Sequence, residues 1–220
     1  MTSPIDTDPR PSGTTGLRRV RLVTWALVLI ALAAFAFVWL RAGPGPGVVT
    51  QRADPGSPGF QLGGPFTLTG ADGRPFSSAQ LAGKPYVMFF GFTHCPDVCP
   101  NTLARLVRLR QQLGQGDRSF EIVFVTVDPE RDTPEAVGSY ARLFNSPIIG
   151  LTGTRGQVDA VAKQHATFQA KVPDANAPDG YTMDHGAAAL LFGRDGKFVS
   201  TIAQEEGDPA ALAKLKRVTA

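Results

Sequence analysis

The sequence predicts an α/β fold, a central mixed sheet flanked by helices, preceded by one N-terminal hydrophobic segment. Residues 86–92 and 120–127 are apolar and rich in aromatic or β-branched side chains, as buried strands are. A helix signal follows the second of these strands, where Thr133 can act as N-cap with Pro134 at the first helical position. Residues 22–40 contain no charged side chain and precede the whole α/β pattern.

Strands and helices alternate along the rest of the chain. The predicted strands cover residues 65–69, 74–76, 86–92, 120–127, 148–151, 187–192 and 197–202. The predicted helices cover residues 101–113, 133–144, 154–168 and 208–218. Residues 171–182 contain two prolines and are expected to form an irregular loop. A β-α-β unit followed by a β-β-α unit is the element order of a thioredoxin-like fold.

The uncharged segment at residues 22–40 admits three interpretations. A core helix of a soluble protein is rarely this uniformly apolar. A cleaved signal peptide has a shorter apolar run and a small residue where Leu40 stands. A transmembrane helix is favoured, because 19 residues at about 1.5 Å each come close to the ~30 Å of a bilayer core. Trp25 and Trp39 lie near its ends, as aromatic side chains at a membrane interface do.

A membrane anchor at this position divides the chain into four predicted parts. They are a disordered cytoplasmic N-terminus, a transmembrane anchor in contact with lipid, a Pro/Gly-rich linker and a thioredoxin-like domain, at residues 1–21, 22–40, 41–59 and 60–220. Arg18, Arg19 and Arg21 precede the anchor and only Arg41 follows it closely. Since positive residues stay in the cytoplasm, the domain is expected on the periplasmic side of the inner membrane.

The charge of the chain argues against a nucleic-acid partner. The net charge is only +3, and much of the basic excess lies next to the hydrophobic segment. A nucleic-acid-binding domain would carry clustered Lys and Arg in its folded part. We therefore expect no nucleic acid among the partners.

Cys95 and Cys99 are the only cysteines of the chain, and they follow the predicted strand at residues 86–92. The N-terminus of the next helix stabilises thiolates through its free N–H groups and its dipole. Residues i and i+4 share one helix face, so both sulfurs can point to one place. The pair suits either a redox-active dithiol or a site for a soft ion such as Cu(I). A purely stabilising disulfide is disfavoured, because so short a loop removes little chain entropy.

Histidines supply further candidates. His185 precedes the strand at residues 187–192, and in a thioredoxin-like sheet that loop lies beside the N-terminus of the first helix. We therefore expect His185 near the cysteines, where a neutral imidazole suits copper. His94 adjoins Cys95 and can tune its charge or compete as a ligand, whereas His165 is expected to be a surface or packing residue.

Acidic residues follow the second buried strand. Asp128 ends this strand at the edge where sites in α/β sheets gather, and Asp132 lies near the start of the next helix. Loop solvation and helix capping are the ordinary roles of such residues, but the position of Asp128 at this edge favours a role at the site. Met183 can offer a thioether, although packing is the commoner role of methionine.

Three motifs in this order, GFTHCPDVCP, VTVDPERDTP and MDHG, resemble the Sco/SenC family. This resemblance implies a thioredoxin-fold copper-binding protein that helps to build the binuclear copper centre of cytochrome c oxidase. By position, Cys95, Cys99 and His185 would be the copper ligands. Asp128 and Asp132 match acidic positions of the second motif, which implies that they support the site or contact a partner. The chain departs from the family at Gly186, where serine is usual, and at residues 192–196, which lack the usual D-P-x-G.

Two functional hypotheses remain at this stage. The first is a metallochaperone that binds Cu(I), and also Cu(II), and passes copper to the accepting subunit of the oxidase. The second is an enzyme, a thiol-disulfide oxidoreductase that reduces the acceptor cysteines or serves redox signalling. Other periplasmic copper chaperones and thioredoxin-like reductants are expected as further partners.

The predicted orientation can be checked with protease. Added to intact spheroplasts, protease should digest residues 60–220, because the arginines before the anchor keep only the N-terminus in the cytoplasm. Immunoblotting against the C-terminal domain measures this. A domain that stays intact until the spheroplasts are lysed would contradict the orientation.

Overall fold

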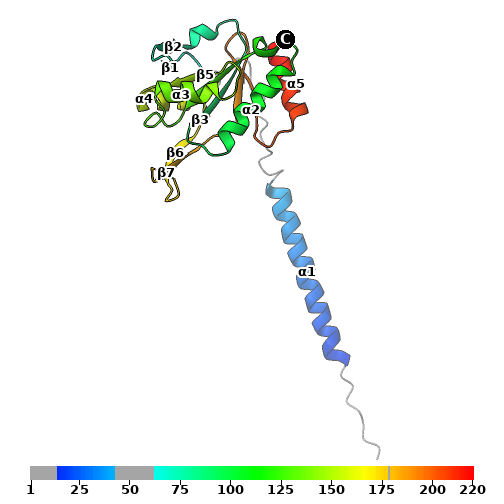
Figure 1. Cartoon of the computed structure of the whole chain (residues 1–220). Helices are drawn as coiled ribbons and strands as arrows, with labels where there is room; N and C mark the ends of the chain where they lie inside the picture. Colours follow the sequence, from blue (N-terminus) through cyan, green and yellow to red (C-terminus); the bar gives the residue numbers. More distant parts are fainter. Residues whose placement is uncertain (1–13, 43–61, 178) are drawn as a thin grey trace, which may run out of the picture. The chain divides into compact units, whose positions relative to one another are not determined.

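The computed structural model describes residues 14–42, 62–177 and 179–220, and the chain divides into two units, residues 1–59 and 60–220 (Figure 1). The described part of the first unit is helix α1 (Thr14–Ala42), which begins within the segment expected to be disordered. Among the described residues, no helix combines the length and apolar character that crossing a membrane requires. Residues 1–13 and most of the expected linker, residues 43–59, lie outside the described residues. The anchor at residues 22–40 stays a prediction.

The second unit contains a seven-stranded mixed sheet in the order β2-β1-β5-β4-β3-β8-β9. The strands are β1 (Thr67–Gly70), β2 (Pro75–Ser77), β3 (Tyr86–Gly91), β4 (Glu121–Thr126), β5 (Ile149–Thr152), β8 (Ala189–Phe192) and β9 (Phe198–Ile202). The pairs β3–β4 and β4–β5 are parallel, and the other neighbours are antiparallel. The predicted class, a mixed α/β sheet with helices, is therefore correct.

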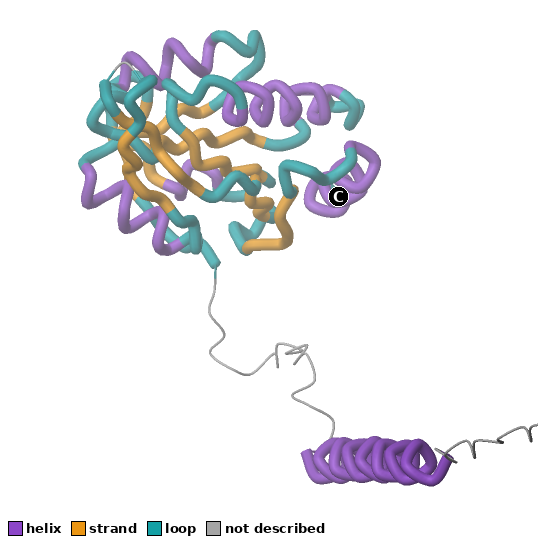
Figure 2. Tube along the Cα trace, turned by 90° about the horizontal axis from the view of Figure 1, so that it is seen from below, coloured by secondary structure: helices purple, strands orange, loops and turns teal. Residues whose placement is uncertain are grey.

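Helices surround this sheet in Figure 2, where the strands form the inner layer. They are α2 (Val98–Gln111), α3 (Pro134–Arg142), α4 (Arg155–Gln164) and α5 (Asp208–Thr219), with short 3-10 turns η1 (Ser78–Leu81) and η2 (Gly116–Arg118). Thr133 caps α3 by accepting a hydrogen bond from the backbone N–H of Ala136, as predicted. Thr154 and Gln157 form the expected capping box of α4.

The central strands explain why the site lies where it does. Every residue of β3 is buried, and five of the six residues of β4 are buried as well. Continuous apolar runs of this kind form the interior of a sheet covered on both faces. Their parallel register pairs Gly91 with Thr126, so both strands end together. The loop with the cysteines and the loop with Asp128 and Asp132 therefore leave the sheet side by side.

One prediction for the fold is partly wrong. The loop expected at residues 171–182 is shorter, because its ends belong to β6 (Gln169–Pro173) and β7 (Tyr181–His185), which form an antiparallel two-stranded sheet. Pro173 does not prevent this pairing, since it is the last residue of β6, where a proline is tolerated. His185 accordingly ends a strand and is not a loop residue.

Helix boundaries differ from the prediction at two places that matter for the site. Helix α2 begins at Val98, three residues earlier than expected, so Cys99 is inside its first turn. Helix α4 ends at Gln164, since Ala166 has a positive φ of 49° that a continuing α-helix does not allow. Residues 165–168 then lead into β6.

Candidate functional site

The junction of β3 and α2 holds both cysteines. The backbone N–H of Cys95 donates to the carbonyl of Phe92 at 3.3 Å, which turns the chain after the strand. The backbone N–H of Cys99 donates to the sulfur of Cys95, also at 3.3 Å. Both cysteines are free thiols; Cys95 is half-buried and Cys99 fully buried. The predicted location at a helix N-terminus is therefore confirmed.

Glycine at position 91 makes room for the buried sulfur. A Cβ atom on Gly91 would lie 2.9 Å from Cys99 Sγ and 2.9 Å from a ring carbon of Phe124. Carbon and sulfur do not approach this closely without displacing one another. The last residue of β3 therefore sets the depth at which the Cys99 thiol sits.

His185 comes to the cysteines from the end of β7. Its Nε2 atom lies 3.6 Å from Cys99 Sγ, and its Nδ1 atom lies 3.1 Å from the carbonyl oxygen of Gly186. Because a carbonyl can only accept, Nδ1 carries the proton and Nε2 presents its lone pair to the thiol. The rings of Phe89 and Phe92 lie steeply inclined to the imidazole, with centroids 6.1 and 5.8 Å away, and hold it in place. The expected proximity of His185 and the cysteines is present.

The two thiols have opposite acid–base properties. A hydrogen bond from the Cys99 side chain outweighs the opposing effect of burial and lowers the pKa of Cys95 to about 4. The same pairing with Cys95, followed by burial, raises the pKa of Cys99 far above that of a free thiol. Near neutral pH, Cys95 is therefore a half-exposed thiolate beside a buried, protonated Cys99.

Asp132 fixes the start of the cysteine loop. Its buried carboxylate accepts hydrogen bonds from the backbone N–H of Thr93 at 2.9 Å, from the hydroxyl of Thr93 at 2.6 Å and from that of Thr126 at 2.6 Å. Each hydrogen bond to a charged group contributes about 1.5–3 kcal/mol. Since Thr93 is two residues before Cys95, Asp132 holds the loop against the end of β4.

Asp128 fixes the second arm of the site. Its buried carboxylate accepts from Arg131 Nε at 2.5 Å and from the hydroxyl of Tyr181 at 3.2 Å. The guanidinium of Arg131 lies 3.9 Å from the Tyr181 ring centroid, and the ammonium of Lys171 lies 3.7 Å from it. Tyr181 begins the strand that ends in His185, so this cluster ties the β6–β7 hairpin to the loop after β4.

The other predicted residues have different environments. His94 is exposed, with Nδ1 3.1 Å from the Thr93 hydroxyl and 3.6 Å from Asp132 Oδ1. His165 is a packing residue, because it is buried among aromatic rings and donates from Nδ1 to the Val161 carbonyl at 2.7 Å. Met183 is buried in the core, which agrees with a packing role.

Sequence reasoning missed two residues that hold the site together. Arg131 lies between Asp128 and Asp132 in the sequence, and nothing local indicates its contact with Tyr181. Tyr181 received no role, because residues 171–182 were expected to be irregular. The i, i+4 spacing of Tyr181 and His185 on an alternating strand is the signal that would have suggested a common element.

The three candidate donors are linked pairwise, Cys95 to Cys99 and Cys99 to His185. Within the described residues, no group of three or more His, Cys, Asp or Glu side chains is close enough to hold a metal ion as it stands. The arrangement can share a proton between two thiols, it can form a disulfide when a partner disulfide is reduced, and it places two soft sulfur donors next to an imidazole lone pair.

A model of the SCO1/SenC family matches residues 55–220, which include the whole described domain. The chain belongs to this family. It is 36% identical over 156 residues to "Protein SCO2, mitochondrial" of Saccharomyces cerevisiae, which is 70% of this chain and 52% of the relative. The chain thus spans about half the length of that curated relative.

Two solved structures of SCO1/SenC relatives with copper bound share the fold. Bradyrhizobium japonicum ScoI is 39% identical with a TM-score of 0.63, over 71% of this chain and 99% of that structure. Yeast Sco1 is 30% identical with a TM-score of 0.65, over 71% of this chain and 87% of that structure. The mixed α/β architecture is therefore that of the Sco proteins.

The departure at Gly186 from the usual pattern of the SCO1/SenC family does not disturb the site. A Cβ atom on Gly186 would meet only the Thr167 methyl group, at an ordinary contact distance of 3.5 Å. The contacts that place His185 use the backbone of Gly186, since its carbonyl faces Nδ1 and its N–H donates to the Phe168 carbonyl. Serine would fit here, and its absence leaves those contacts intact.

The two thiols should react differently with an alkylating reagent. Because the thiolate of Cys95 persists down to about pH 4, iodoacetamide should modify Cys95 at an almost constant rate between about pH 5 and pH 8. Cys99 should stay unmodified in the folded chain. Peptide mass spectrometry after a timed reaction of the copper-free chain measures both.

The chain unfolded in urea is the control, in which both thiols should react mainly above about pH 8. Preferential labelling of Cys99 in the folded chain, or a Cys95 rate that falls steeply below about pH 8, would contradict this assignment.

Proposed function

We propose that this SCO1/SenC protein is a copper metallochaperone that binds copper through Cys95, Cys99 and His185. It delivers the ion to the binuclear copper centre of cytochrome c oxidase. The observation that carries this proposal is the contact between Cys99 Sγ and His185 Nε2 at 3.6 Å, beside the half-exposed sulfur of Cys95.

The chemistry of the donors fits copper. Thiolates and imidazole nitrogen are the ligands that Cu(I) and Cu(II) prefer, and hard ions such as Mg²⁺ favour oxygen. With metal bonds of about 2.3 Å to sulfur and about 2.0 Å to nitrogen, two ligands of one ion lie roughly 3.6 Å apart at a tetrahedral angle. The distance of 3.6 Å between Cys99 Sγ and His185 Nε2 agrees with this value. Binding one ion with all three donors requires Cys95 to come closer to the other two.

Comparison with relatives supports the choice of copper. The structures of Bradyrhizobium japonicum ScoI and of yeast Sco1 were both solved with copper bound, and each aligns with 71% of this chain. The resemblance to the Sco/SenC family supports an oxidase subunit as the acceptor.

Transfer requires an accessible ligand, and Cys95 supplies it. Cys99 is fully buried, whereas Cys95 is half-buried at the edge of the site. A partner thiolate can therefore approach from the Cys95 side while Cys99 and His185 still hold the ion. Three protein donors leave a position for this incoming ligand.

The same proposal assigns Asp128 and Asp132 to supporting roles. Asp132 orients the cysteine loop, and Asp128 orients the hairpin with His185 through Arg131 and Tyr181. We also propose residues 22–40 as the membrane anchor that keeps the domain at the periplasmic surface near a membrane-bound acceptor.

Copper binding tests the proposal directly. Under reducing, oxygen-free conditions the full chain should bind about one copper ion, because two thiolates and one imidazole form one site. His185→Ala and Cys99→Ser should lose tight binding. Titration with Cu(I) against a competing chelator measures stoichiometry and affinity.

His94→Ala is the matched control, since this exposed histidine adjoins Cys95 and faces Asp132. It should keep the wild-type stoichiometry. Loss of copper binding in His94→Ala together with normal binding in His185→Ala would contradict the proposal and identify His94 as the imidazole ligand.

A second function, thiol-disulfide exchange, is favoured by one specific observation. Cys95 is a half-exposed thiolate and Cys99 is a buried thiol directly behind it. This is the arrangement of an attacking and a resolving cysteine: Cys95 attacks a partner disulfide, and Cys99 then displaces the reduced partner while Cys95 and Cys99 form a disulfide. Such a protein would keep the acceptor cysteines reduced.

Trapping distinguishes this second function. If exchange operates, Cys99→Ser should accumulate a mixed disulfide between Cys95 and an oxidised acceptor domain of the oxidase, because no resolving thiol remains. Non-reducing electrophoresis with mass spectrometry detects it. Cys95→Ser is the control and should trap nothing, and equal trapping in both variants would rule the mechanism out.

A further inference from the structure

The antiparallel pairing of β8 and β9 stops abruptly near the site. The last pair in the register is Ala189 with Ile202. Continuing the same register would pair Ala188 with Ala203 and Ala187 with Gln204. Neither pair forms, so the two chain segments separate at this end of the sheet.

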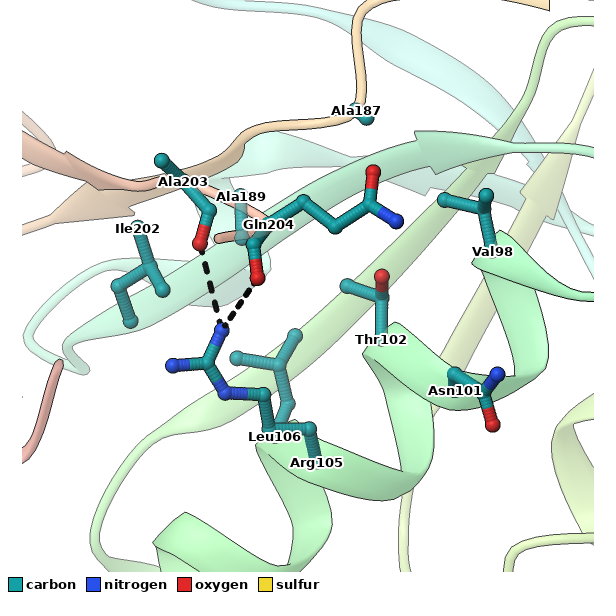
Figure 3. Close-up of a pocket in the computed structure, with 10 residues that line it drawn as sticks. All are labelled: Val98, Asn101, Thr102, Arg105, Leu106, Ala187, Ala189, Ile202, Ala203 and Gln204. Carbon is teal, nitrogen blue, oxygen red and sulfur yellow. Dashed lines mark hydrogen bonds between the residues drawn. The ribbon is translucent and has the colours of Figure 1, made fainter. Parts of the chain in front are cut away.

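The β9 side of this opening is satisfied within the protein. Arg105 of α2 donates from Nη1 to the carbonyls of Ala203 and Gln204, at 3.3 Å each (Figure 3). The N–H of Ala203 donates to the carboxylate of Glu206 at 3.2 Å. These bonds hold the end of β9 against α2 and away from β8.

The β8 side is not satisfied. In the part of the chain that the structure describes, nothing hydrogen-bonds to the backbone N–H or C=O of Ala187 or Ala188. Both residues are half-buried, and they connect His185 and Gly186 to β8. Backbone groups in such a position require water or another chain as a partner.

A pocket of about 230 Å³ lies in this opening. One wall is a face of α2 and the other is formed by the ends of β8 and β9 (Figure 3). Its lining residues are Val98, Asn101, Thr102, Arg105, Leu106, Ala187, Ala189, Ile202, Ala203 and Gln204. Val98 precedes Cys99 and Ala187 follows His185 by two residues, so the pocket adjoins the proposed copper site.

The charge of the pocket lining indicates which kind of ligand fits. Arg105 is the only charged residue of its lining, and its Nε donates to Asp208 at 2.8 Å. No unpaired charge of the lining is therefore left to attract an ion. The walls are mainly small or aliphatic, and the volume suits one apolar side chain rather than a cofactor of ordinary size, which needs roughly 300 Å³ or more.

We propose that Ala187 and Ala188 bind an extended peptide segment of the copper-accepting protein by backbone hydrogen bonds. One aliphatic side chain of that segment enters the pocket between Thr102 and Gln204. The bound segment takes the place of the missing partner of β8 and carries its own metal-binding thiol beside Cys99 and His185. This inference rests on the proposed function for the identity of the partner.

Filling the pocket tests the inference with the full chain, purified in detergent, and the soluble copper-accepting domain of cytochrome c oxidase as the probe. Thr102→Trp should weaken binding of this domain by at least about tenfold, because the aliphatic side chain loses its place. It should still bind copper with wild-type stoichiometry, since no donor is altered. In the wild-type chain, hydrogen exchange at the amides of Ala187 and Ala188 should slow by about tenfold or more on complex formation.

Ala104→Trp is the matched control, because it adds the same ring to the same helix at an exposed position outside the pocket lining. It should bind the acceptor normally. Gln204→Trp fills the pocket from the opposite wall and serves if Thr102→Trp lowers the melting temperature.

Three other results would contradict the docking surface, the identity of its occupant and the copper function, respectively. Normal acceptor binding by both pocket-filling variants, with unchanged exchange at Ala187 and Ala188, would place the docking surface elsewhere and leave the copper function standing. Self-association that the variants abolish would identify a second copy of the chain as the occupant instead. A wild-type chain that binds no copper would overturn the proposed function itself.

Discussion

The site depends on the hydrogen bonds that the buried carboxylate of Asp132 accepts. Asp132 follows the end of β4, and its carboxylate accepts hydrogen bonds from the backbone N–H and the hydroxyl of Thr93, which follows the end of β3. A charge without solvent is stable only where several donors surround it. The Thr126 hydroxyl supplies a third bond, so the two loops at this edge of the sheet share one anchor. The position of Cys95 follows from that anchor.

The second arm of the site is held in a similar way by different groups. Asp128, also buried, connects through Arg131 to the ring of Tyr181 in the β6–β7 hairpin. The hairpin is outside the main sheet, and β6 and β7 pair only with each other in the described chain. Its position therefore depends on side-chain contacts of this kind. Both loops of the candidate site thus meet at the segment between β4 and α3.

The two thiols differ in a way that suits both proposed functions. Burial and pairing with Cys95 keep Cys99 protonated, while the hydrogen bonds that Cys95 accepts stabilise its thiolate. A thiolate at the surface can exchange metal or attack a disulfide, and the buried thiol next to the His185 lone pair can complete either reaction. The proposed copper transfer and the alternative thiol exchange would therefore use the same atoms in different states.

Local patterns in the sequence determined most of the fold and the identity of the donors. The apolar runs of β3 and β4, the cap at Thr133 and the capping box at Thr154 depend on neighbouring residues only, so each was predictable. The spacing of Cys95 and Cys99 and the expected approach of His185 followed from the predicted topology.

Only the tertiary structure decided how those donors are held. The hairpin of β6 and β7 was not predicted, because Tyr181 is stabilised by Arg131, 50 residues away in the chain. The separation of β8 from β9 depends on Arg105 reaching the carbonyls of Ala203 and Gln204. Contacts between residues so distant in the chain leave no periodic pattern, since each depends on how whole elements pack. The sequence determined which atoms are the candidate copper ligands, and packing decided where they meet and which backbone is left open beside them.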